Sequence, residues 1–305
     1  MNEKNNAIEQ DILIDKIDLS DIFSAVWSQK FSILLTTFIF ASIFMVISLT
    51  IPNTYTSSAL LTPASEEDSL TNQLGSYSSL VGFAGIQISS EGGKSAEAME
   101  RIQSFDFFKD HFLPFIKFED LVAAKKWKPK ENKIIYNNNI FLDTEKKWVR
   151  KSDKGPKPSH QEAYERYLKI LAISEDKKSK FVTIKINHVS PVISKAWLDL
   201  IISNINSHMR NIDKDIAQNA VDYLNKASSE TNLSEIKTAI SQLLENQIQI
   251  LMLTESTEEY VYKIISSPIS PEKKSSPQRL LITIFGAFLG LIFGLVFSLY
   301  RHLYN

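Results

Sequence analysis

Cysteine is absent from the 305-residue chain. Its absence excludes a disulfide framework, a cysteine-bound zinc or iron–sulfur site, a thiol nucleophile and a lipoprotein anchor. Glycine, with 9 residues, and proline, with 10, are scarce, which excludes long flexible linkers and collagen-like repeats. Neither sign of charge dominates, because 34 Lys and Arg face 35 Asp and Glu. We therefore expect no nucleic-acid partner.

The residue patterns of catalysis and of metal binding are also missing. No G-x-S-x-G occurs, and Gly93-Lys94-Ser95 lacks the earlier glycine of a phosphate loop, since Ile88 stands at that position. The five histidines are scattered without metal-ligand spacing, at positions 111, 160, 188, 208 and 302. We predict no catalytic residue, no cofactor and no metal, and hence a protein that is not an enzyme.

Two long apolar runs do stand out, one near each end of the chain. Residues 31–51 and 280–300 are both free of charge over 21 residues, which corresponds to about 31 Å of helix, the thickness of a bilayer's hydrocarbon core. A cleaved signal peptide has a shorter apolar region behind a short basic head, whereas a largely acidic 30-residue head stands here. We predict two retained transmembrane helices rather than two buried core helices of a soluble protein.

Two crossings place both termini on one side of the membrane and the middle of the chain on the other. Lys4, Lys16, Lys30 and Arg301 flank the spans on the terminal side, which favours a cytoplasmic location for the termini. The predicted segments are an amphipathic cytoplasmic head 1–30, a span 31–51, an extracytoplasmic domain 52–279, a span 280–300 and a cytoplasmic tail 301–305.

The first part of the middle domain predicts mixed short elements. A strand is expected at 55–63, because Thr, Ser and Leu fill a run of strand length. Helical spacing of apolar residues predicts a helix from Ser95 to about 112, capped by Ser95, and a second short helix at 118–127. Further on, we expect strands at 133–136 and 139–143, a helix at 161–167, and a hairpin of strands at 168–174 and 180–188.

A long amphipathic helix follows. Ser190 and Pro191 suit the N-cap and first helical positions. Apolar residues then recur every three or four positions from Ile193 to Ala227, a stretch of 35 residues. Such a narrow stripe predicts a coiled coil or helical hairpin. The pattern breaks at 228–232 and resumes with a capping box of Asn232 and Glu235; we favour a helix–helix turn there over a kink. A strand at 260–266 completes an α/β base (52–189 and 259–279) that carries a helical arm (190–258). The fold class is thus an α+β membrane protein.

Three prolines precede the second span, and three glycines recur within it. Pro268, Pro271 and Pro277 predict an extended, stiff exit from the domain into the span. Gly286, Gly290 and Gly294 recur every four residues and form one smooth stripe, where another helix backbone can approach closely. We predict that this stripe serves transmembrane packing and oligomerisation.

In this arrangement the chain resembles the Wzz-type chain-length determinants, the polysaccharide co-polymerases. The segments that carry the resemblance are spread over nearly the whole chain: residues 17–22 with Trp27 before the first span, the strand 55–63, the strand and helix start 181–206, and the prolines and glycine stripe 267–294. The resemblance is to the class without a kinase domain.

This resemblance implies a periplasmic α/β base with an extended helical arm and a multi-pass protein of the bacterial inner membrane. It also implies a ring-like homo-oligomer whose partners are a membrane polysaccharide polymerase and a lipid-linked glycan. The implied function is non-enzymatic control of chain length in O-antigen or related lipopolysaccharide biosynthesis. Alternatives are a two-anchor membrane sensor or an export-complex adaptor with a periplasmic ligand domain, and a membrane-bound glycan enzyme is disfavoured by the missing catalytic pattern.

Overall fold

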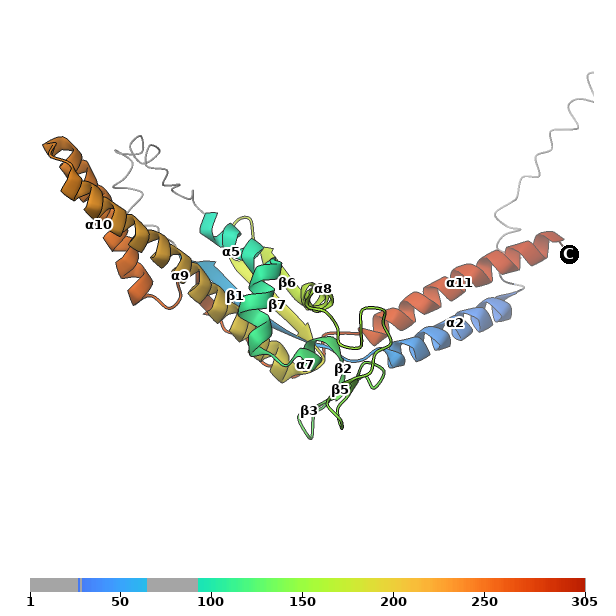
Figure 1. Cartoon of the computed structure of the whole chain (residues 1–305). Helices are drawn as coiled ribbons and strands as arrows, with labels where there is room; N and C mark the ends of the chain where they lie inside the picture. Colours follow the sequence, from blue (N-terminus) through green and yellow to red (C-terminus); the bar gives the residue numbers. More distant parts are fainter. Residues whose placement is uncertain (1–26, 28, 65–92, 305) are drawn as a thin grey trace, which may run out of the picture. The chain divides into compact units, whose positions relative to one another are not determined.

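The computed structural model describes residues 27, 29–64 and 93–304 and shows an α+β fold (Figure 1). The chain divides into two compact units, residues 1–52 with 276–305 and residues 53–275, and each is described by itself. Most of the predicted cytoplasmic head lies outside the described residues.

The first unit is a pair of antiparallel apolar helices. Helix α2 spans Lys30–Thr50 and helix α11 spans Arg279–Tyr304, and they lie side by side (Figure 1). Both are long and apolar enough to cross a membrane. Most of the large apolar side chains of these two helices are exposed in the isolated chain. Exposed apolar side chains are expected on a helix that is surrounded by hydrocarbon and not by water.

The second unit is built on a four-stranded antiparallel sheet. Its order is β6 (Leu171–Glu175), β7 (Val182–His188), β1 (Tyr55–Pro63) and β8 (Tyr262–Ser266). The central strand β1 pairs with β7 on one side and β8 on the other. The predicted hairpin is present as β6 and β7, but its first strand begins at 171, because α8 (His160–Ile170) continues through the residues expected to start it.

The core lies where one face of this sheet meets the long helix α9 (Pro191–Glu230). Alternate residues of β7 are fully buried, as the two-residue period of a half-buried strand requires. On α9 the buried residues follow helical spacing from Trp197 to Met209. Trp197 packs edge-on against Phe112, with ring centroids 5.5 Å apart, and thereby joins α9 to the layer of short helices.

The helix predicted from Ser95 to residue 112 is interrupted. It consists of α5 (Gly93–Gln103), α6 (Phe105–Phe107), a π-helical turn η1 (Phe108–Phe112) and a 3-10 turn η2 (Leu113–Phe115). The break has a local cause, because the Ser104 hydroxyl accepts a hydrogen bond from Phe107 N at 3.2 Å and starts a new helix. The prediction that Ser95 caps the helix is wrong: Ser95 is buried inside α5, and its carbonyl accepts a hydrogen bond from Tyr262 Oη at 2.7 Å.

The second short helix is also shorter than predicted. Helix α7 spans only Phe118–Val122. The next residues, Ala124–Lys128, form strand β2, which pairs with β3 (Lys133–Tyr136). Residues 124–128 were predicted to be helical from their spacing, but their backbone N–H and C=O groups form hydrogen bonds with β3 instead. The expected strand at 139–143 is reduced to β4 (Phe141–Leu142), which pairs with β5 (Lys147–Trp148).

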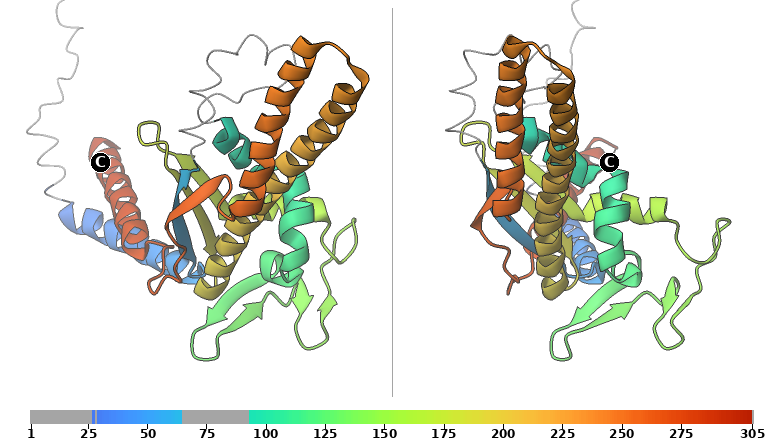
Figure 2. Two further views of the ribbon diagram at one scale, coloured as in Figure 1. Left: turned by 90° about the vertical axis from the view of Figure 1, so that its left-hand side faces the viewer. Right: turned by 60° about the vertical axis from the view of Figure 1, so that its left-hand side comes forward.

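The arm is a helical hairpin, so the break in the long helix is a turn and not a kink. Helix α10 (Ser234–Ser256) runs back beside α9 (Figure 2), and Lys214 of α9 forms an ion pair with Glu255 of α10. Helix α9 ends at Glu230, within the break predicted at 228–232. The predicted capping box is absent: the N-cap of α10 is Leu233 and makes no side-chain capping bond.

The junction between β7 and α9 is held by a buried histidine. His188 is 6% exposed; its Nδ1 accepts a hydrogen bond from Ser190 N at 3.1 Å, and its Nε2 lies 3.0 Å from the carbonyl oxygen of Asp120. Since Nδ1 is an acceptor, Nε2 carries the proton and donates it to that carbonyl. The neutral ring therefore joins α7 to the first turn of the arm.

This junction predicts a specific loss of stability in weak acid. Burial lowers the pKa of His188, so the unfolded chain takes up this proton more readily, and stability falls as the pH drops below about 6.5. His188→Asn, which keeps a donor and an acceptor, should flatten the pH dependence of the unfolding midpoint between about pH 6.5 and 5. The buried Asp120 carboxyl, whose pKa is raised by burial, acts in the opposite direction. An unchanged slope in the variant would contradict this assignment.

A second buried polar side chain ties the arm to the sheet. Asn206 of α9 is 4% exposed, and its Oδ1 accepts hydrogen bonds from Val261 N at 2.8 Å and Tyr262 N at 2.9 Å. Its Nδ2 donates to the Tyr262 carbonyl at 3.1 Å. One amide thus satisfies three backbone groups at the start of β8.

Removing this amide should loosen β8. Asn206→Ala leaves buried backbone groups unpaired, at a cost of about 1–3 kcal/mol for each group that finds no water. We expect a lower unfolding midpoint and faster amide exchange at Val261 and Tyr262. Asn211→Ala, on the exposed side of the same helix, is the matched control. Equal effects of the two variants would show that Asn206 has no special role.

Candidate functional site

The glycine stripe lies against the neighbouring apolar helix of the same chain. A Cβ atom added at Gly290 would lie 2.7 Å from Phe40 Cβ and 2.8 Å from Thr37 Cα. At Gly286 it would lie 2.5 Å from Phe44 Cβ, and at Gly294 it would meet the Thr36 hydroxyl. The three glycines therefore let α11 approach the α2 backbone more closely than any side chain allows.

Aromatic and hydroxyl side chains complete this helix–helix contact. Phe40 stacks on Phe293 with ring centroids 5.3 Å apart, and the Thr36 hydroxyl donates to the Gly290 carbonyl at 3.4 Å. The contact explains the stripe within one chain. The predicted role of the same residues in oligomerisation stays a prediction.

The predicted proline-rich exit is divided between the two units. Within the second unit, Pro268 is buried and Pro271 half-buried, and the segment is fastened to β1 because the Ser57 hydroxyl donates to the Ile269 carbonyl at 2.8 Å. Ser275 N donates to the Thr54 carbonyl at 2.8 Å. Pro277 belongs to the first unit and is buried. The role of the three prolines as a stiff exit stays a prediction.

The helical hairpin exposes large apolar side chains. On α9, Ile216 and Tyr223 are 61% and 73% exposed, and their spacing of seven places them on one side of the helix. On α10, Ile248 and Met252 are exposed four residues apart. We call these four residues the arm patch. A contiguous exposed apolar surface marks a protein–protein contact, and these four side chains are the arm's candidates for one.

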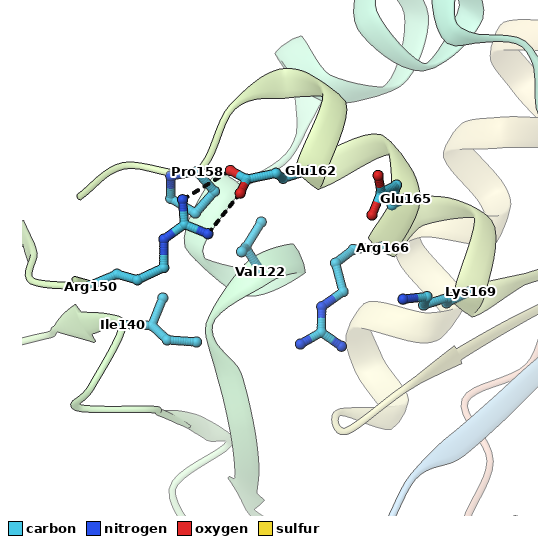
Figure 3. A pocket seen from close by; sticks show the side chains of 8 residues that line it. All are labelled: Val122, Ile140, Arg150, Pro158, Glu162, Glu165, Arg166 and Lys169. Atoms are coloured by element: carbon cyan, nitrogen blue, oxygen red, sulfur yellow. Dashed lines mark hydrogen bonds and ion pairs between the residues drawn. The ribbon is translucent and has the colours of Figure 1, made fainter. Parts of the chain in front are cut away.

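A basic pocket of about 210 Å³ lies beside α8 (Figure 3). Arg150, from the loop after β5, holds both carboxylate oxygens of Glu162, with N–O distances of 3.0 and 2.9 Å. Glu162 also accepts from Ser159 N in the capping box of α8, and the guanidinium with this backbone bond lowers the pKa of Glu162 to about 2. The pocket is completed by Val122, Ile140, Pro158, Glu165, Arg166 and Lys169.

Two of the scattered histidines meet in the folded chain. His111 of η1 and His208 of α9 have ring centroids 4.2 Å apart, in a hollow of about 440 Å³ that is also lined by carboxylates. Burial lowers the pKa of His208. Among the described residues, no group of three or more such side chains is placed to hold a metal ion. Because His111 and His208 are 97 positions apart in the chain, no spacing pattern in the sequence could have predicted that they meet.

In the sequence, two helices that are long and apolar enough to cross a membrane flank an α+β domain with a long helical arm. Residues 15–109 match the family model described as "Wzz: Chain length determinant protein". This match confirms the resemblance to the Wzz-type chain-length determinants and supports a role in setting polysaccharide chain length. A search of curated protein sequences found no match.

Two solved structures are distantly similar. A "full-length bacterial polysaccharide co-polymerase" shares 13% identity, with 93% of this chain and 97% of that chain covered and a TM-score of 0.39. A fragment of WzzB, a polysaccharide co-polymerase from Salmonella Typhimurium, shares 13% identity, with 73% and 100% covered and a TM-score of 0.30. Similarities this distant carry no argument about function.

Proposed function

We propose that the protein is a non-enzymatic regulator of polysaccharide chain length in the bacterial inner membrane. The observation that carries this proposal is the family match over residues 15–109. The two apolar helices support it, because they provide the membrane anchor that such a regulator needs. The polymer is O-antigen or a related lipopolysaccharide, and the partner is a membrane polysaccharide polymerase.

In this proposal α2 and α11 cross the membrane and both termini lie in the cytoplasm. The domain between residues 52 and 279 then lies in the periplasm, where the α/β base holds the hairpin arm. The antiparallel order of α2 and α11 supports this arrangement, since it brings the chain back across the membrane beside its point of departure.

The working unit is a ring-like homo-oligomer that holds the polymerase or the lipid-linked glycan. The arm patch supports assembly, because burying it against another copy removes large apolar side chains from water. Chain length then follows from the geometry of the assembly and not from a catalytic residue.

Deleting the gene and separating the extracted polysaccharide on a gel tests this function. We expect the banded length distribution to be lost on deletion and restored by the full chain. A distribution that is the same with and without the gene contradicts the proposal and favours a sensor or an export adaptor.

A further inference from the structure

The basic pocket beside α8 lies outside the residues that match the family model. We propose that it binds one acidic sugar unit of the polysaccharide, a pyranose that carries a carboxylate or a phosphate. The inference rests on the proposed function, because it names a chemical feature of the polymer that the protein handles.

The pocket carries one net positive charge, because three cations, Arg150, Arg166 and Lys169, are set against two carboxylates, Glu162 and Glu165. Glu165 is exposed, and it forms no ion pair with Arg166 or Lys169. Glu162 is occupied on both oxygens by Arg150, so it does not neutralise Arg166, one turn further along α8. In the described part of the chain, neither Arg166 nor Lys169 forms an ion pair. Their spacing of three places both cations on one side of the helix, and a guanidinium presents paired donors that fit a carboxylate or a phosphate.

The floor of the pocket is apolar. Val122 lies between the side chains of Arg150 and Arg166, with Ile140 beside Arg150 (Figure 3). A pyranose ring has an apolar face of C–H groups that packs on such side chains, while its charged substituent reaches the cations. Drug-sized ligands occupy pockets of roughly 300–1,000 Å³, so about 210 Å³ suits a single sugar unit.

The ion pair fixes one wall of the pocket before any ligand arrives. Arg150 is held in a two-bond contact with Glu162, and Glu162 is itself fixed by Ser159 N at the start of α8. Arg166 and Lys169, which are exposed, are the groups that contact the anion.

Binding of four small probes to the full chain in a sugar-free detergent tests the proposal. The probes are glucuronate, glucose 6-phosphate, glucose and inorganic phosphate, measured by titration calorimetry. We expect both sugar anions to bind at least about ten-fold more tightly than glucose or phosphate. Arg166→Gln should weaken their binding about ten-fold or more, and Lys169→Gln should weaken it in the same direction. Lys125→Gln, an exposed cation outside the pocket, should leave it unchanged.

Each other outcome overturns the inference. Equal binding of glucose removes the role of charge, and equal binding of phosphate removes the role of the sugar ring. Equal effects of Arg166→Gln and Lys125→Gln place the site elsewhere, and circular dichroism shows whether the variants are folded. If the gene still sets a banded length distribution but no sugar anion binds, the pocket proposal alone fails. If deletion leaves the distribution unchanged, the proposed function fails whatever the pocket binds.

Discussion

Gly290→Leu is expected to separate the two apolar helices and to broaden the polysaccharide length distribution. Even the single carbon of Gly290→Ala would lie 2.8 Å from Thr37 Cα, which is backbone and cannot rotate away. Overpacking a close contact costs about 1–3 kcal/mol, so alanine should weaken the contact and leucine should disrupt it. Replacing Gly286, Gly290 and Gly294 together with leucine should have the largest effect on the modal length.

The chain's lack of cysteine makes this contact measurable. Phe40→Cys with Phe293→Cys introduces the only two thiols, at positions whose rings now stack, and a short thiol-specific cross-linker reports whether the helices remain together. Val296→Leu adds one carbon at a side chain that is 62% exposed, and it is the control for Gly290→Ala. Undiminished cross-linking and an unchanged modal length in Gly290→Leu would refute the structural role of the stripe.

Tyr223→Glu with Met252→Glu is expected to dissociate the proposed homo-oligomer while the arm stays folded. Glutamate is a good helix former, so the hairpin should persist, whereas a charge cannot be buried in an apolar contact between copies. Burying one large apolar side chain contributes about 1.5–3 kcal/mol, and each substitution should therefore raise the dissociation constant roughly ten- to hundred-fold. Light scattering of the protein in detergent measures the mass of the particle.

The matched control adds the same two charges at exposed polar positions of the same helices. Asn225→Glu, on the side of α9 opposite Tyr223, with Gln242→Glu should leave both the particle mass and the modal length unchanged. If the double variant at Tyr223 and Met252 keeps the parent mass, the arm patch is not the surface through which copies assemble.

Elements with long, regular patterns could be predicted from the sequence. The strand expected at 55–63 is β1 with the same bounds, because turn residues and a proline delimit it. The apolar stripe from Ile193 to Ala227 also predicted the long helix, because apolar residues that recur every three or four positions indicate a helix. A helix–helix turn was predicted correctly, although Asn232 does not cap the second helix.

Elements decided by tertiary contacts could not be predicted. Ser104 interrupts a stretch whose apolar spacing is continuous, so the break between α5 and α6 has no periodic signal. The lysine-rich strand β2 exists because β3 lies beside it. The basic pocket joins Arg150, from an irregular loop, to the capping residue Glu162 of α8; such a meeting of loop and helix depends on the fold and not on spacing.

Polymerisation in membrane vesicles that contain the polymerase, with labelled repeat units, tests the central claim most directly. Adding the purified full chain should narrow a broad length distribution to a modal one, and the chain alone, without polymerase, should neither extend nor cleave the glycan. A distribution that stays broad at every protein concentration, or turnover of glycan by the protein alone, would contradict control of length by a non-catalytic membrane scaffold.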